Sequence, residues 1–261
     1  MYATERQEVI ERMLLQSGRV GVLELATHFD VTTETVRRDL DALERSGALR
    51  RVHGGAVPLD RASLVEPSVA DRVARHSDSK RSIAHRALDV LGEDFRGSIF
   101  FDAGTTTNAV ADQLAARLLA TRGTAEVVTH SLYLAHTLAS VETVSLSLIG
   151  GRVRGVTAAA VGAETVRAIS GLRPDIAFVA TNALSAGFGA STPDPEEAAV
   201  KAAIVRSARR IVLVADQSKF ETERLVSFAA LSDLDILVTD AEPPAVLRTA
   251  LDEADVEVWT A

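Results

Sequence analysis

From residue 98 onward, short apolar runs alternate with stretches of helical periodicity, and this alternation constrains the fold more than any other feature. Apolar runs predict strands at 98–101, 126–129, 144–149, 175–180, 211–215, 236–239 and 256–259. Helices are predicted between them at 106–120, 131–140, 161–170, 195–209 and 243–251. Such alternation is typical of a mostly parallel sheet with helices on both faces. We therefore predict an α/β fold for residues 79–261.

The loop after the first predicted strand has the composition of a phosphate site. A glycine lets the backbone turn there, and the amides and hydroxyls that follow lie at the start of a helix, where phosphate groups bind. The loop lacks the Gly-Lys-Ser/Thr end of a Walker loop, and the alternative is that a Gly-Thr-Thr sequence simply caps the helix. The predicted phosphate-binding residues are Gly104, Thr105, Thr106 and Thr107.

Polar residues and glycines also follow the other predicted strands. Because ligands of parallel sheets bind beyond the carboxyl ends of the strands, we expect these residues to line one ligand site. The residues after the strands are Asp102, His130, Ser131, Gly150, Gly151, Arg152, Asn182 and Asp216. Glu197 and Lys201, in the segment that starts the helix predicted at 195–209, complete the set. Two alternatives remain open, because His130 alone could be an ordinary loop histidine and Glu197 with Lys201 could form a surface pair at i, i+4 spacing.

Lysine is rare in this chain, which has 25 arginines but only Lys80, Lys201 and Lys219. A lysine that remains can mark a place where a compact ammonium is needed. Chance on a solvated surface is the alternative. Since Lys201 and Lys219 both fall at ligand-side positions, we predict that Lys219 supplies positive charge to the phosphate.

The first 57 residues have the pattern of a winged helix-turn-helix. Thr4 and Gln7 suggest a capping box that opens the first helix, which ends at Gly18. A short second helix follows at 22–29, and a third is predicted at 33–45 with Thr32 as its N-cap and Gly47 closing it. The run 49–52 reads as a strand and 53–55 as a hairpin tip.

Two helices joined by a tight turn, the second opening with small polar residues, is the geometry of DNA reading. The short threonines let the third helix approach base edges, the arginines behind them reach guanine or phosphate, and the wing meets the DNA backbone. The predicted DNA-binding residues are Thr32, Thr33, Thr35, Arg37, Arg38, Arg50, Arg51, His53 and Gly54. The alternative is a small helical bundle with arginines on a solvated face.

Charge and composition agree with this division. The chain has a net charge of −8, of which residues 1–58 carry −1 through eight arginines and nine acids, leaving −7 for the rest. DNA binding needs local positive charge rather than a basic whole. Cysteine is absent, which excludes disulfides and thiolate zinc sites. We predict no metal ion, no cofactor and no membrane segment, and expect a cytoplasmic protein.

Several motifs resemble the DeoR family of bacterial sugar-metabolism repressors. In the first domain these are Arg6, Ile10 and Leu14, the run Thr32-x-x-Thr35-Val36-Arg37-Arg38-Asp39-Leu40, and the wing at 49–56. In the second they are 102–107, Gly150-Gly151, 193–198 and 216–220. Glu66-Pro67 and Arg72 resemble the family's linker, which we place at 58–78. The resemblance spans nearly the whole chain.

The resemblance implies a sheet related to ribose-5-phosphate isomerase and coenzyme A transferases, and an effector that is a phosphorylated sugar. It also implies operator DNA and a homo-oligomer, here a dimer or tetramer, as partners. The chain departs from the family at His130 and at 180–183, positions expected to touch the sugar, so the sugar is not named. Two alternatives are a sugar-phosphate isomerase fused to a DNA-binding head, and a repressor whose sensor domain serves only oligomerisation.

Overall fold

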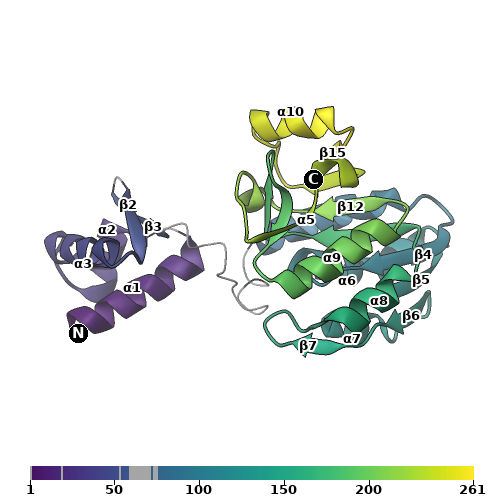
Figure 1. Cartoon of the computed structure of the whole chain (residues 1–261), viewed down its shortest axis with the longest axis horizontal. Helices are drawn as coiled ribbons and strands as arrows, with labels where there is room; N and C mark the ends of the chain where they lie inside the picture. The colour runs from purple at the N-terminus through teal and green to yellow at the C-terminus, as the bar shows by residue number, and fades with distance from the viewer. Residues whose placement is uncertain (1, 19, 53, 59–71, 73–75) are drawn as a thin grey trace. The chain divides into compact units, whose positions relative to one another are not determined.

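The computed structural model describes residues 2–18, 20–52, 54–58, 72 and 76–261 (Figure 1). The chain divides into two compact units, Met1–Pro67 and Ser68–Ala261, called here the head and the sensor domain. Most of the predicted linker 58–78 lies outside the described residues, as does His53, and the proposed linker boundaries remain a prediction. Within the described ranges, no helix combines the length and the apolar character needed to cross a membrane.

The head is a winged helix-turn-helix. Its described elements are α1 (Ala3–Ser17), β1 (Val20–Gly21), α2 (Val22–Phe29), α3 (Thr33–Arg45), β2 (Leu49–Val52) and β3 (Gly55–Pro58). The three strands form an antiparallel sheet in the order β1-β3-β2. Ile10, Leu25 and Leu40 are fully buried between the helices, with Leu49 of the wing beside them. Apolar residues at helical spacing therefore fold this small unit around one core.

The ends of two helices test the predicted caps. Thr32 caps α3 as predicted, since its hydroxyl accepts a hydrogen bond from the Thr35 amide at 3.2 Å. The predicted start of the first helix at Thr4 is wrong, because α1 begins at Ala3. The Tyr2 amide donates to the Glu5 carboxylate at 3.0 Å, so a glutamate in the first turn supplies the stabilising bond without a threonine cap.

The sensor domain is built on a seven-stranded parallel sheet, which confirms the predicted fold class. The strands are β4 (Arg96–Phe101), β5 (Thr124–Thr129), β6 (Val144–Leu148), β9 (Ile176–Ala180), β12 (Ile211–Val214), β14 (Ile236–Thr239) and β15 (Glu257–Thr260). Their order in the sheet is β15-β14-β12-β9-β4-β5-β6. The chain thus starts in the middle, runs out to β6 and returns to the other side of β4. The crevice between β4 and β9 is the switch point where such sheets bind ligands.

Helices cover both faces of this sheet (Figure 1). One face packs on α5 (Ser77–Ala87), α6 (Thr105–Ala120) and α7 (Leu132–Leu138), and the other on α8 (Ala163–Ser170), α9 (Pro195–Ser207) and α10 (Ala245–Glu253). Neighbouring residues of a strand point to opposite faces. Phe100 accordingly packs in the core beneath α8, α9 and α10, and Phe101 in the core beneath α5, α6 and α7. Because both faces are buried, the strands are continuous apolar runs.

Five short strands of the sensor domain escaped the sequence analysis. They are β7 (Arg152–Arg154), β8 (Ala159–Val161), β10 (Ala183–Ser185), β11 (Gly189–Thr192) and β13 (Val226–Ala229). They form small antiparallel sheets of three or four residues per strand, rich in alanine, glycine, serine and threonine. Such segments have no apolar periodicity from which a strand could be predicted. One of them also displaces a predicted helix start: the helix expected from residue 161 begins at Ala163, because Val161 belongs to β8.

Candidate effector site and DNA interface

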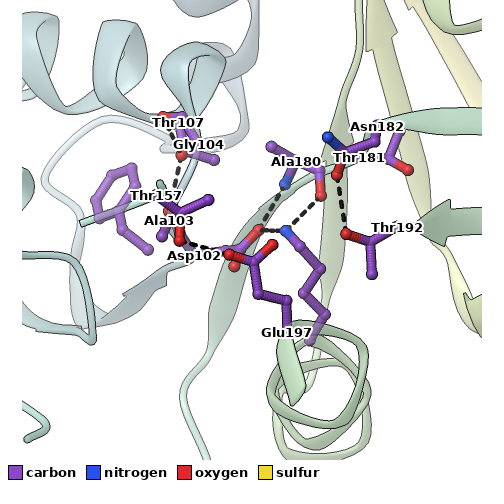
Figure 2. Close-up of polar contacts among 12 residues, drawn as sticks. Asp102, Ala103, Gly104, Thr107, Thr157, Ala180, Thr181, Asn182, Thr192 and Glu197 are labelled. Carbon is purple, nitrogen blue, oxygen red and sulfur yellow. Dashed lines mark hydrogen bonds and ion pairs between the residues drawn. The ribbon is translucent and has the colours of Figure 1, made fainter. Parts of the chain in front are cut away.

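A buried ion pair occupies the switch point of the sheet (Figure 2). Asp102, directly after β4, is fully buried and accepts a hydrogen bond from the Ala180 amide at the end of β9 at 3.0 Å. Lys201 of α9 contacts the same carboxylate oxygen and donates to the Ala180 carbonyl at 2.8 Å. The pair therefore ties together the two strands and the helix that surround the crevice.

His130 contacts the other oxygen of Asp102. Its Nδ1 lies 2.8 Å from the Ala160 carbonyl, which can only accept, so Nδ1 carries a proton. Its Nε2 lies 3.2 Å from Asp102 Oδ1 and 3.2 Å from the Ala103 amide. With an exposed fraction of 2%, His130 is a buried connection between β4, β5 and β8 and not an ordinary loop histidine.

The carboxyl of Asp102 stays ionised through these contacts. Burial by itself would raise its pKa, but the Lys201 ammonium and the contact with His130 outweigh burial, so the pKa lies below its ordinary value. Both carboxylate oxygens are occupied by groups of the chain. A ligand that bound Asp102 or Lys201 directly would have to replace one of these contacts.

The loop 104–107 opens α6 beside this pair (Figure 2). A Cβ atom on Gly104 would lie 2.6 Å from the Cβ of Ala180, so only glycine lets the loop approach β9 this closely. The Thr107 hydroxyl donates to the carbonyls of Asp102 and Gly104 at 2.7 and 2.8 Å. No described residue accepts a hydrogen bond from the amides of 105–107, so the first turn of α6 presents unused donors.

Asp216 and Lys219 lie two strand positions away, after β12. Asp216 is 1% exposed, accepts the Ser218 amide at 3.0 Å and lies 3.9 Å from the Lys219 ammonium. Burial by itself would raise the pKa of Asp216, but Lys219, Ser218 and His76 together hold it below its ordinary value. The Lys219 side chain is 31% exposed, so it reaches the surface at the carboxyl edge of the sheet.

The start of α9 binds the hairpin formed by β7 and β8. Glu197 is buried and accepts from Arg154 at 3.2 Å and from the Thr157 hydroxyl, while Arg152 pairs with exposed Glu196. The surface pair considered for Glu197 and Lys201 is absent from these contacts, because each residue has a different partner. Arg154 and Thr157 were not among the predicted site residues, since their short strand and loop have no recognisable sequence pattern.

The other predicted ligand residues described by the structure mostly bond or pack against neighbouring residues of the chain. The Thr192 hydroxyl donates to the Asn182 side chain at 3.0 Å, and Ser131 caps α7 by accepting the Leu134 amide. Gly151 has φ +154°, and a Cβ there would lie 2.1 Å from the Thr165 hydroxyl, so packing alone requires a glycine; Gly150 accepts from that hydroxyl at 3.0 Å. Among the described residues, no cluster of side chains could hold a metal ion.

The first turns of α3 carry the predicted DNA-reading residues. Arg37 and Arg38 have exposed side chains, 3.9 and 3.6 Å from the carboxylate of Glu34 one turn earlier. On the wing, the Arg51 guanidinium pairs with Asp41 and its amide donates to Glu44. Thr32 and Gly54 are exposed, and Thr33 and Thr35 are partly exposed. The structure describes only the backbone of Arg50, which lies in β2.

Comparisons with known proteins agree with both parts of the chain. The family model for the DeoR C terminal sensor domain matches residues 75–241, and that for the DeoR-like helix-turn-helix domain matches residues 6–62. The sensor sheet also resembles a structure of ribose 5-phosphate isomerase A from Methanocaldococcus jannaschii, with 16% identity, a TM-score of 0.41 and coverage of 55% of this chain and 54% of that one.

Relatives match over nearly their full length. The HTH-type transcriptional regulator GlpR of Haloferax volcanii is 36% identical over 258 residues, covering 99% of this chain and 98% of that protein. The glycerol-3-phosphate regulon repressor of Escherichia coli K12 is 31% identical over 259 residues, with 99% of each covered. Both names support a regulator over the isomerase-like enzyme. The chain therefore belongs to the DeoR family of DNA-binding transcriptional regulators.

Proposed function

We propose that this regulator represses genes of carbohydrate metabolism and that a phosphorylated sugar, bound at the carboxyl edge of the sensor sheet, changes its affinity for operator DNA. The full-length similarity to a glycerol-3-phosphate regulon repressor supports this class of effector. The observation that carries the proposal is the loop 104–107, which places unused amides at a helix start in the switch-point crevice.

The loop supplies uncharged donors for a phosphate. α6 has 16 residues, and the dipole of such a helix stabilises an anion at its start by up to about 2 kcal/mol in a partly buried site. Thr105 is partly exposed and adds a hydroxyl to the amides. These groups bind a dianion without adding another buried charge beside Asp102 and Lys201.

Lys219 supplies the formal positive charge. β9 separates β4 from β12, so the ends of these strands are about 10 Å apart, a span that a phosphate and an extended lysine side chain can bridge. The part of the chain after residue 58 carries a net charge of −7 and repels a dianion unless donors are concentrated locally. A compact ammonium that reaches a phosphate bound at the loop would provide that concentration.

The other predicted ligand residues fall into two roles. Asn182 and Arg152 are partly or fully exposed and are proposed to contact the sugar. The buried contacts of Asp102, His130 and Lys201 are proposed to hold the crevice open in the correct shape. These three groups are already bonded to one another. We therefore propose that they orient the loop and do not contact the anionic effector directly.

Titration calorimetry tests the phosphate site. The full-length protein is titrated with glycerol 3-phosphate and with pentose and hexose phosphates, each beside its unphosphorylated form. We expect binding of phosphorylated compounds only, and a loss of at least about tenfold in affinity for Lys219→Ala and for Thr105→Ala, because each removes a donor to a charged group. Thr121→Ala, at the opposite end of α6, serves as the matched control and should bind normally.

Two outcomes would contradict this placement of the phosphate. One is equal affinity for a sugar phosphate and its free sugar. The other is wild-type affinity in both Lys219→Ala and Thr105→Ala. If no compound of the panel binds, the sensor domain does not recognise this class of effector.

In the proposed DNA complex, α3 lies in the major groove and the wing lies against the backbone. One head reads too few base pairs for regulatory specificity, so a dimer or tetramer presents paired heads to repeated half-sites. Arg37 and Arg38 extend from the first turns of α3, and Arg51 extends from β2. Their exposure supports base contacts for the first two and a backbone contact for the third.

A further inference from the structure

The sheet edge formed by β6 lies in a part of the chain with few charges. Residues 127–161 contain one acid, Glu142, and two arginines, Arg152 and Arg154. Both arginines are paired with acids of α9 or its cap. The whole chain has a net charge of −8, so two copies repel each other unless they meet through a nearly neutral surface.

Exposed apolar side chains gather around the same edge. Leu148 at the end of β6 pairs with Thr129 of β5, the Leu132 amide donates to the Ala158 carbonyl at 3.0 Å, and Ser131 bridges to Ala159. These contacts join the ends of β5 and β6, the start of α7 and the hairpin of β7 and β8 into one surface. Its exposed apolar residues are Leu132, Tyr133, Leu148, Val153 and Val156.

The backbone of β6 has an unpaired side. Among the described strands, β6 pairs only with β5. The Thr143 carbonyl and the Ile149 amide both bond β5, and these directions alternate along a strand. Leu146 and Leu148 therefore direct their N–H and C=O groups away from the sheet. Val144 directs its C=O group the same way, while its amide donates to the Val141 carbonyl at 3.0 Å.

This edge lacks the features that normally prevent strands from pairing between molecules. Natural edge strands carry charges, prolines or bulges, and the opposite edge of this sheet has exposed Glu257 on β15. β6 instead reads Val-Ser-Leu-Ser-Leu, with Ser145 and Ser147 exposed. An uncharged, regular edge is suited to a strand of another molecule.

We propose that two copies of this chain associate through antiparallel pairing of their β6 strands about a two-fold axis. The partner is a second copy because a strand can pair with its own symmetry mate when its outward backbone groups alternate about a central residue. With the axis at Leu146, the two copies of Leu146 exchange two hydrogen bonds. The Val144 carbonyl of each copy accepts from the Leu148 amide of the other. This inference rests on the proposed function in one respect, the expectation that the regulator is a dimer or tetramer.

The same register places serines opposite each other. Ser145 of one copy faces Ser147 of the other as a pair without hydrogen bonds, with Cβ atoms about 4.5–5.5 Å apart. Like charges at such positions destabilise strand pairing and opposite charges stabilise it. This pairing provides a test by charge exchange that does not disturb the core, because both serines are exposed.

Two full-length double variants, Ser145→Glu with Ser147→Glu and Ser145→Arg with Ser147→Arg, are compared with the wild type by sedimentation velocity at equal micromolar concentration. We expect each variant alone to have half the mass of the wild-type oligomer, and an equimolar mixture of the two to regain the wild-type mass. Leu119→Glu changes an exposed apolar residue of α6 outside this surface and should leave the mass unchanged.

Wild-type mass in both double variants would overturn the proposal. So would dissociation of both without recovery in the mixture, because misfolding or a different interface would produce that result. A monomeric wild type would overturn it together with the expectation of an oligomer. Failure of the effector proposal is seen separately, as calorimetric binding that does not depend on the phosphate group.

Discussion

On α3, the charge of Glu34 is shared by two arginines that are proposed to read DNA. The three side chains are 55–78% exposed, and the closest charged atoms are 3.6 and 3.9 Å apart. Exposed ion pairs of this kind contribute about 0–1 kcal/mol. Arg37 and Arg38 can therefore exchange Glu34 for guanine or phosphate at small cost, while Glu34 keeps a negative charge near the DNA backbone.

Substitutions on α3 should separate specific from general DNA affinity. Arg37→Ala and Arg38→Ala should each weaken operator binding by about 1–3 kcal/mol. Glu34→Gln should strengthen binding to unrelated DNA, because it removes a charge that repels phosphate. Fluorescence anisotropy at fixed salt, with an operator obtained by in vitro selection, measures both. Arg12→Ala, an exposed arginine on α1, is the control, and unchanged operator affinity after replacing both Arg37 and Arg38 would refute the helix assignment.

At the scale of elements, one buried ion pair fixes α3 against α1. Arg6 donates to both carboxylate oxygens of Asp39, at 2.7 and 3.2 Å, and the two side chains are 9% and 5% exposed. A buried charge without its partner is costly, whereas an exposed pair contributes little. The same helix offers the exposed counterpart, since Asp41 pairs with Arg51 at 45% and 38% exposure.

Asp39→Asn should destabilise the head by roughly 3–5 kcal/mol, because it leaves the Arg6 guanidinium buried without a counter-charge. Asp41→Asn should cost at most about 1 kcal/mol. Urea unfolding of the full chain, followed by far-ultraviolet circular dichroism, measures the loss. The single tryptophan, Trp259, lies in β15, so a transition without a change in its fluorescence belongs to the head. Similar costs for the two variants would show that the buried pair is not what orients α3.

At the scale of the whole molecule, the proposed effector and the operator must influence each other equally. If the effector changes operator affinity through a coupling of about 1–3 kcal/mol, the operator changes effector affinity by the same factor. Release from DNA is the expectation for the family, and in that case the calorimetric affinity for the effector should fall by the same factor when operator DNA is present. An effector affinity that operator DNA leaves unchanged would mean that the two sites are not coupled.

Much of the architecture follows from local patterns in the sequence. All seven strands of the parallel sheet lie where apolar runs predict them, and the three helices of the head lie where helical periodicity predicts them. Both patterns depend only on near neighbours in the sequence. The rule that ligands bind at strand ends selected Asp102 and His130, and the rarity of lysine drew attention to Lys201. The structure brings these three residues into contact. The sequence thus indicated which residues belong to the site, but not which residues they bond.

The tertiary structure alone decided what those residues do for the fold. Lys201 meets Asp102 across 99 positions of sequence, and the Ala180 amide and carbonyl complete the network only because β9 returns beside β4. The hairpin that brings Arg154 and Thr157 to Glu197 was invisible in the sequence. Local patterns determine which segments become strands and helices, whereas the state of a buried charge depends on desolvation and on partners supplied by distant segments.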